Sequence, residues 1–329
     1  MILLDTHNQA VEDILINRFE AAKQDPEQKV RLNYTVADFD GVTYNITDGG
    51  EKRKLFVSIS LSFFDELKQH GVVEFLRQEY GNLLATQTQP SQSSTLIIDL
   101  DNLPEDHSQL AHKCALLKRN CMASLFVKFF DLQPQVNPKS DGTRAVIHYR
   151  PEETIYIHAL HDRVTVIFST LFQDPDDMLI GKLFMQEFVE SRRRLDRAPQ
   201  VLYSYRTPPA ELRGMNTVVS DQVAYITFVL GPRHITTGPV RQKTIDLIQM
   251  LRNYLHYHLK CSKAYIQMRM RAKTVEFLKV INRARVEITG TPVITVAPTG
   301  EISPLYAAAL AAKSGNIAEA TESRSSRFG

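Results

Sequence analysis

The sequence is poor in the residues that mark several common classes of protein. Its 329 residues include 14 glycines, three cysteines and no tryptophan. No expected strand is followed by a glycine-rich loop that opens a helix, so a nucleotide-binding signature is missing. Cys114, Cys121 and Cys261 are too few for a disulfide framework and suit a reducing compartment. No serine, cysteine or lysine stands in a recognisable nucleophile context, so we expect a protein that is not an enzyme.

Long apolar runs are also missing, which bears on membrane association. No run reaches about 18 apolar residues, the length that a membrane span needs. The segment Met1–Phe19 contains apolar residues, but charged residues interrupt it, so we expect neither a signal peptide nor a span. The interrupting residues are Asp5, Glu12, Asp13 and Arg18. The sequence therefore predicts a soluble, cytoplasmic protein.

Glycine and proline are absent between Pro239 and Gly290, and this absence predicts one long helix. From Val240 to Arg285 it would measure about 69 Å at 1.5 Å per residue. An apolar stripe recurs at alternating steps of four and three, and a second apolar row beside it makes the surface too wide for a two-stranded seam. We expect a partner subunit to bury this stripe, which comprises Leu247, Leu251, Tyr254, His258, Cys261, Tyr265 and Met268.

Charge is distributed unevenly along the chain. The expected helix carries a net charge of +9, whereas the remainder carries −7, and the two nearly cancel to +2 overall. A basic helix on an acidic body indicates an acidic or polyanionic partner. Aromatic residues do not alternate with the cations as base-stacking platforms would require, so nucleic acid is not an expected partner. An anionic phospholipid surface stays open as an alternative partner.

The rest of the chain shows one order of elements twice: three strands, a helix, two strands and a helix. We expect an α+β fold with two structurally similar two-layer domains, each an antiparallel sheet with helices on one face, plus the long C-terminal helix. After a helix at Ile2–Ala22, the first half has strands at Val30–Asp38, Val42–Thr47 and Lys54–Ser60, a helix at Phe63–Tyr80, strands at Asn82–Thr86 and Thr95–Asp101, and a helix at His107–Phe130. The second half has strands at Arg144–Tyr149, Thr154–Ala159 and Arg163–Thr170, a helix at Asp174–Arg194, and strands at Val201–Tyr205 and Val223–Leu230.

The expected division of the chain follows from this pattern. The domains are 1–132 and 143–239, joined by a linker at 133–142 that contains prolines and an Asp-Gly turn. The interaction helix occupies 240–285. The tail 286–329 is rich in alanine, serine and threonine and lacks large apolar residues, so we expect it to be mostly disordered.

Two groups of residues superficially suggest a metal site. Asp38 and Asp40 lie in an Asp-Phe-Asp-Gly sequence between two expected strands, where turn formation is the better explanation. His256, His258 and Cys261 lie on the long helix, but His256 faces away from the other two. A structural zinc site normally needs four ligands, so packing in a helix interface explains them better. We therefore expect no metal and no cofactor.

Several blocks of sequence together resemble one known family, that of subunit 2, the larger scaffold subunit, of the actin-related protein 2/3 complex. The resemblance runs in order from Met1 to about Arg285. The blocks are Ala37–Val42, Val57–Leu61, Leu117–Cys121, Arg144–Arg150, Asp162–Thr170, Ile180–Lys182, Tyr254–His258, Lys260–Ile266 and Arg269–Thr274.

The resemblance implies a non-enzymatic scaffold located at the cortical branched-actin cytoskeleton. Its partners would be the smaller scaffold subunit, with which it forms a core heterodimer, the other subunits including the two actin-related proteins, and the side of a mother actin filament. Basic residues face actin in that family, and this sequence matches at Arg192 and Arg193 and along the distal helix, with an extra arginine in the cluster as a departure. The candidates for the actin contact are Arg192, Arg193, Arg194, Lys279, Arg283 and Arg285. The alternative function is an adaptor that binds anionic phospholipid through the same basic helix. The tail after Arg285 has no counterpart in the resemblance.

Overall fold

A computed structural model of the chain describes residues 4–24, 32–50, 53–89, 91–195, 198–236 and 238–283. Met1–Gln267 forms one compact unit, and the chain from Met268 onward forms a second. All the strands in the described residues lie in the first unit. The expected α+β class, with two antiparallel sheets, helices and a long C-terminal helix, is confirmed.

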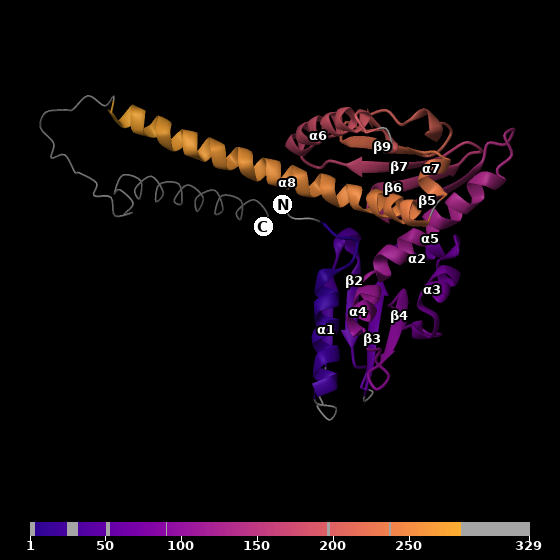
Figure 1. The fold of residues 1–329 in the computed structure, drawn as a ribbon. Coiled ribbons are helices and arrows are strands. Elements are labelled where there is room, and N and C mark those ends of the chain that lie inside the picture. The colour runs from indigo at the N-terminus through magenta and orange to yellow at the C-terminus, as the bar shows by residue number, and fades with distance from the viewer. Residues whose placement is uncertain are drawn as a thin grey trace, which may run out of the picture. The chain divides into compact units, whose positions relative to one another are not determined.

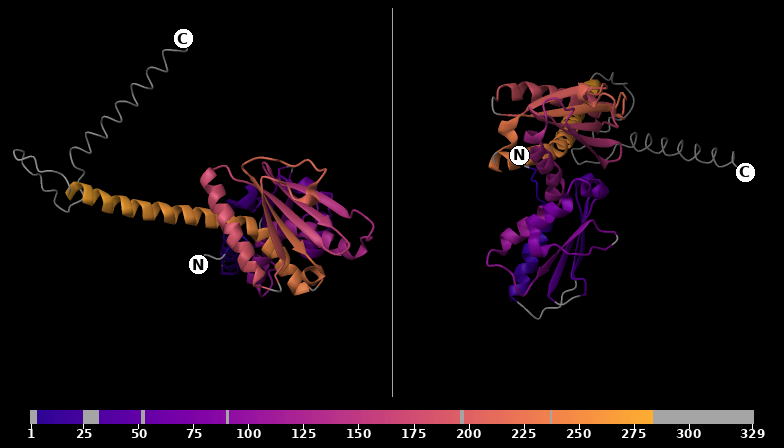
Figure 2. Two further views of the ribbon diagram at one scale, coloured as in Figure 1. Left: turned by 90° about the horizontal axis from the view of Figure 1, so that it is seen from above. Right: turned by 90° about the vertical axis from the view of Figure 1, so that its right-hand side faces the viewer.

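The first half of the larger unit is a four-stranded antiparallel sheet with helices on one face (Figures 1 and 2). Its strands pair in sequence order, β1-β2-β3-β4. Side chains alternate between the two faces, and Leu55, Val57 and Ile59 of β3 are fully buried beneath the helices. The elements are α1 (Gln9–Gln24), β1 (Asn33–Ala37), β2 (Thr43–Thr47), β3 (Lys54–Ser60), α2 (Phe64–Lys68), α3 (Val72–Tyr80), β4 (Ser94–Asp99), α4 (His107–Ala115) and α5 (Leu117–Leu132).

The second half is a five-stranded antiparallel sheet in the order β5-β6-β7-β9-β8. Helix α6 and the first part of α8 cover one face of it (Figure 2). On the opposite face, Tyr156, Ile167 and Tyr225 pack with Leu212 from the loop between β8 and β9. The elements are β5 (Thr143–Arg150), β6 (Glu153–Ala159), β7 (Val164–Leu171), α6 (Pro175–Arg193), β8 (Gln200–Tyr205), β9 (Val223–Leu230), α7 (Pro232–Ile235) and α8 (Gly238–Arg283).

The four strands of the first sheet follow the same order as β5, β6, β7 and β9 of the second, so the repeated pattern is confirmed for these strands. In the second sheet, β9 lies between β7 and β8. In the first sheet, β4 lies between β3 and Leu84, which forms a single antiparallel bridge to Leu96 of β4. The counterpart of β8 is thus reduced to one residue pair. The strand expected at Asn82–Thr86 is therefore wrong: a short 3₁₀ turn at Gly81–Leu83 takes up the start of that segment.

Two expected helices are each divided in two. The helix expected at Phe63–Tyr80 breaks at Gly71, whose φ of +87° lies outside the right-handed helical region. The helix expected at His107–Phe130 breaks at Leu116, where ψ is 3°. The hydrophobic period continues through both breaks, so it could not reveal either of them.

Helix α1 begins at Gln9, later than the expected start at Ile2. Asn8 ends the preceding segment, and its side-chain oxygen accepts a hydrogen bond from the backbone N–H of Val11 at 3.1 Å. This is an N-cap, which satisfies a donor that the first helical turn leaves unpaired. The backbone N–H of Asn8 also donates to the carbonyl of Ala115 at 3.1 Å, so the cap joins α1 to the end of α4.

One continuous apolar core runs through both halves of the larger unit. Helix α8 extends over 46 residues, from Gly238 to Arg283, close to the expected 240–285. Arg285 and the expected disordered tail 286–329 lie outside the described residues. The boundaries 1–132, 133–142 and 143–239 remain our proposed division of the chain.

Candidate functional site

The first part of α8 is a component of the chain's own core. Its buried residues recur every three or four positions, so they form one face of the helix. That face packs against the same core as the inward residues of β7 and β9. The residues are Thr244, Ile245, Ile248, Leu251, Leu255 and Leu259. Nearly half of the long helix is therefore required for the second sheet to be covered.

Ion pairs join α8 to the first half of the larger unit. Arg119 of α5 pairs with Asp246 at 2.7 Å. Arg241 donates to Asp131, at the end of α5, also at 2.7 Å. These pairs have members that are only partly exposed, so water screens them less than it would screen an open surface pair. Helix α8 is thus held by both halves of the fold.

The expected partner-facing stripe is divided between the interior and the surface. Leu251 is only 4% exposed and packs in the chain's own core, so the expectation that a partner covers it is corrected. Tyr254 is half-buried, and its hydroxyl donates to the carbonyl of Leu4 at 3.4 Å. His258 is also half-buried and stacks on Phe184 of α6, with ring centroids 5.0 Å apart. Leu251, Tyr254 and His258 thus contact other residues of the same chain.

The other members of the stripe are exposed. Leu247 and Cys261 lie at the surface. Further along α8, Tyr265, Met268 and Phe277 are 58%, 64% and 67% exposed. Large apolar side chains are rarely left at this exposure in a row, and such surfaces mark interaction sites. The exposed large apolar residues from Tyr265 to the end of α8 occupy more than one face of the helix, and we call them together the distal apolar row: Tyr265, Ile266, Met268, Met270, Val275, Phe277, Leu278, Val280 and Ile281.

The expected basic contact residues are only partly within the described structure. Arg194 follows the end of α6 and is exposed. Lys279 and Arg283 are exposed on the last turns of α8, and neither forms an ion pair with another described residue. Arg285 lies outside the described residues, and nothing is described of the side chains of Arg192 and Arg193. The described members are cations that remain available to an acidic surface.

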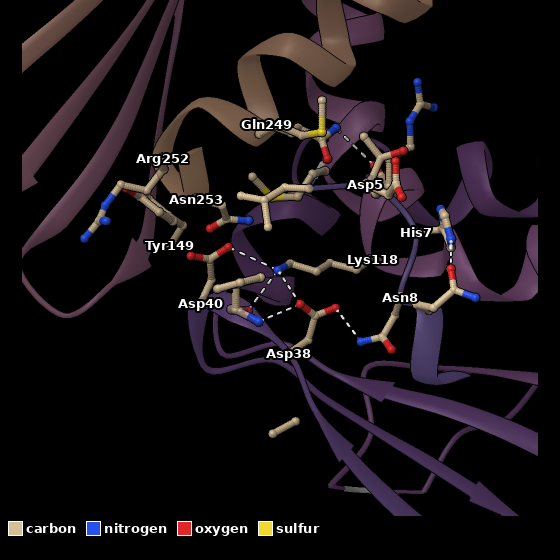
Figure 3. A pocket seen from close by; sticks show the side chains of 18 of the residues that line it. Asp5, His7, Asn8, Asp38, Asp40, Lys118, Tyr149, Gln249, Arg252 and Asn253 are labelled. Carbon is tan, nitrogen blue, oxygen red and sulfur yellow. Dashed lines mark hydrogen bonds and ion pairs between the residues drawn. The ribbon is translucent and has the colours of Figure 1, made fainter. Parts of the chain in front are cut away.

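A cleft of about 460 Å³ lies between the start of α1, the turn after β1, and α8 (Figure 3). The Nζ atom of Lys118 lies 3.4 Å from Asp38 and 3.2 Å from Asp40. Asp40 occupies the turn with a φ of +67°, and Arg150 of β5 donates to its carboxylate at 2.6 Å. The Asp-Phe-Asp-Gly segment is therefore a turn, and the carboxylate of Asp40 joins the first half to the second.

The charge network continues from Arg150 to α8. Arg150 lies 3.7 Å from Glu153, and Arg252 donates to the same carboxylate at 2.9 Å. The hydroxyl of Tyr149 also donates to Glu153, at 3.1 Å. Burial, reinforced by the Glu153 charge, raises the pKa of Tyr149 well above its usual value, so its proton stays in place. Because acids and bases alternate and neutralise one another here, the network serves to hold the fold together.

The cysteines and the histidines of α8 have structural surroundings. Burial raises the pKa of Cys114 to about 12 and that of Cys121 further, so both remain neutral thiols. Burial, with the charges of Arg252 and Lys260 beside it, lowers the pKa of His256. His258, by contrast, is used in the stacking contact with α6. Among the described helices, none combines the length and apolar content needed to cross a bilayer.

Comparison with known proteins agrees with the sequence resemblance. Residues 57–288 match the family described as the Arp2/3 complex 34 kD subunit p34-Arc. The chain is 39% identical over 309 residues to actin-related protein 2/3 complex subunit 2 of Schizosaccharomyces pombe, an alignment that covers 88% of this chain and 95% of the relative. It is 36% identical over 293 residues to the protein of the same name from Dictyostelium discoideum, covering 88% and 96%. This chain belongs to the p34-Arc family of Arp2/3 complex subunits.

Proposed function

We propose that this chain is a non-catalytic scaffold subunit of the actin-related protein 2/3 complex and that it contacts the mother filament. Its partners are the smaller scaffold subunit, the other subunits and filamentous actin, and its location is the cytoplasmic actin cytoskeleton. Family membership supports the place in the complex, because both relatives carry the name of its subunit 2. In the described cleft, the charges of Lys118, Asp38, Asp40 and Arg150 pair with one another.

The distal apolar row carries the scaffold part of this proposal. Burying one such side chain completely contributes about 1.5–3 kcal/mol. Several of them stand exposed on one helix, so a protein that covered them would gain a large apolar interface. The smaller scaffold subunit is the partner that we assign to this row. Because β-sheets and α8 share one core in Met1–Gln267, that partner would bind a chain whose larger unit is already folded.

The basic residues support the filament contact. Lys279 and Arg283 are exposed and carry uncompensated charge within the described part of α8. We assign them, with Arg192, Arg193, Arg194 and Arg285, to the surface that meets filamentous actin. Cations at an interface rim act mainly through long-range attraction, which raises the rate of encounter with an acidic partner.

The scaffold proposal is tested by co-expressing the chain with the other subunits of the complex. The variant Met268→Asp/Val275→Asp should lose co-purification with the smaller scaffold subunit, because it places two charges on one apolar face of the helix. Both side chains are exposed, so the larger unit should still fold, and its far-ultraviolet circular dichroism should be unchanged. The matched control is Gln267→Asp, which adds a charge at an exposed polar position next to the row.

Two results would contradict parts of the proposed function. Normal assembly of the double variant would overturn the assignment of the distal apolar row to a subunit interface. Binding of the wild-type assembly to phosphatidylserine vesicles, with no retention on actin filaments, would replace the filament contact with the anionic phospholipid alternative.

A further inference from the structure

Three potential metal ligands meet on the surface of the first half of the larger unit. His7 precedes α1, Glu12 lies in its first turn, and His112 lies near the end of α4. One ligand atom from each lies within 4.8 Å of the other two. His112 follows Glu12 by 100 positions, so only the packing of α1 against α4 brings the group together.

The three ligand atoms lie close enough together to reach one small cation. The Nε2 atom of His7 lies 3.1 Å from Oε2 of Glu12, and Nδ1 of His112 lies 3.0 Å from the same oxygen. Ligand atoms bound tetrahedrally to zinc at 2.0–2.2 Å are separated by roughly 3.4 Å. The two imidazole rings are 4.7 Å apart and tilted by 54°, so they converge without stacking.

Hydrogen bonds alone leave one donor of this arrangement shared between two acceptors. Glu12 Oε2 faces two ring nitrogens, while His7 Nε2 also faces the side-chain oxygen of Gln9 at 2.9 Å. The proton on Nε2 of His7 would have to be shared between Glu12 and Gln9. A cation bound between the three residues uses the lone pairs of both nitrogens and of the carboxylate together.

The ligands are held in place by the surrounding structure. Asn8 caps α1 and bonds to Ala115 at the end of α4, and its side-chain amide donates to Asp38 at 3.0 Å. His7 is thus tied between two helices. The side chains of His7 and Glu12 are 14% and 16% exposed, whereas His112 is 47% exposed. The side chains of His7 and Glu12 are therefore largely buried, and an ion can reach the group from solvent on the side of His112.

We propose that His7, Glu12 and His112 bind one divalent transition-metal ion of the zinc class, with water in the remaining position. Two imidazoles and a carboxylate suit zinc, cobalt or nickel and disfavour magnesium and calcium, which prefer oxygen ligands alone. The bound ion ties the start of α1 to α4. An ion at this site joins segments that lie 100 residues apart in the sequence, so its binding is coupled to the packing of α1 on α4.

The test is metal binding by the full chain, purified in the assembly in which it is soluble and stripped with a chelator. Wild-type protein titrated with Zn²⁺ should bind one equivalent more than the His112→Ala variant. Glu12→Gln should weaken this binding by more than about tenfold, since even residues that only support a ligand contribute 10–100-fold. Zn²⁺ should also raise the melting temperature of the wild type, and Mg²⁺ should not.

Matched controls lie elsewhere on the same fold. His161→Ala removes a histidine of similar exposure, and Glu20→Gln neutralises an exposed carboxylate on α1; both should bind Zn²⁺ like the wild type. Co²⁺ should give a visible absorption band in the wild type that is absent from His112→Ala. If His112→Ala and Glu12→Gln titrate as the wild type does, the residues form only a hydrogen-bonded cluster and the site is overturned.

Discussion

Arg252 of α8 forms a bidentate ion pair with Glu153, the first residue of β6. Nη2 of Arg252 lies 2.9 Å from Oε1 of Glu153, and Nε lies 3.1 Å from Oε2. The two side chains are 11% and 4% exposed. Burial alone would lower the pKa of Arg252, but the charge and hydrogen bonds of Glu153 outweigh burial, so the pKa is raised. The pair therefore stays ionised and fastens α8 to the second sheet.

Removing one member of this pair should destabilise the fold strongly. Arg252→Met leaves the buried Glu153 carboxylate with only the more distant Arg150, at 3.7 Å, as a cation, and breaking a buried pair costs up to about 3–5 kcal/mol. Urea denaturation, followed by circular dichroism, should show this loss. The control Arg271→Met changes an exposed arginine of the same helix and should cost less than about 0.5 kcal/mol. Equal effects of the two variants would contradict the role assigned to the pair.

A close backbone approach should make Gly142 intolerant of any side chain. Gly142 has a φ of +76°, and a Cβ atom there would lie 2.1 Å from the carbonyl oxygen of Ala159. Gly50 has the same φ with open space around it, so Gly50→Ala should cost only the left-handed strain of about 1–2 kcal/mol. Gly142→Ala should cost clearly more, because β5 and β6 must also separate. The two melting temperatures, compared directly, test this difference.

Acidification should weaken the fold through His70. Burial lowers the pKa of His70, and the charge of Lys128 lowers it further. The unfolded chain therefore takes up this proton at a higher pH than the folded chain does. The stabilisation is complete above the unfolded pKa of about 6.5 and is lost as the pH falls through the folded pKa.

The variant His70→Gln removes the titrating imidazole, so its comparison with the wild type measures the contribution of His70 to the pH dependence. Its melting temperature should fall less than that of the wild type between about pH 7.5 and pH 5.5. His161→Gln, which changes an exposed histidine in the turn between β6 and β7, should follow the wild-type profile. Parallel profiles for His70→Gln and the wild type would show that other groups govern the acid sensitivity.

Charge reversal on the last turns of α8 should weaken filament binding without preventing assembly. Attraction between exposed charges is screened over about 8 Å at physiological ionic strength. The assembled complex carrying Lys279→Glu/Arg283→Glu should therefore co-sediment less with actin filaments and show a smaller dependence on salt. Lys139→Glu reverses an exposed charge in the linker and serves as the control. Unchanged co-sedimentation would place the filament contact elsewhere.

Local patterns predicted many elements well, because short-range periodicity and turn residues determine them. The expected strands Lys54–Ser60 and Val223–Leu230 have the bounds seen in the structure. The break at Gly71 was missed because glycine is tolerated inside an amphipathic pattern. The prediction of a strand at Asn82–Thr86 was wrong because only Leu84 of this segment pairs with the sheet, through one bridge to Leu96. The local pattern of residues could not show how far this pairing extends.

The candidate sites were harder to predict than the elements. An apolar stripe shows that a helix face is covered, but not whether the same chain or another one covers it. Leu251 and Met268 belong to one stripe, yet the first is buried in the chain's core and the second is exposed. The group of His7, Glu12 and His112 gave no signal because its members are brought together only by tertiary packing.

The strand order of the second sheet has a consequence for biosynthesis. Phe228 of β9, the strand between β7 and β8, shares a core with Leu255 and Leu259 of α8. A nascent chain cannot close this core until the ribosome has delivered residues beyond 259, whereas the first sheet pairs its strands in the order in which they are made. Until β9 and the first part of α8 have been made, β7 presents an unpaired edge and an uncovered apolar face, the kind of surface that chaperones bind.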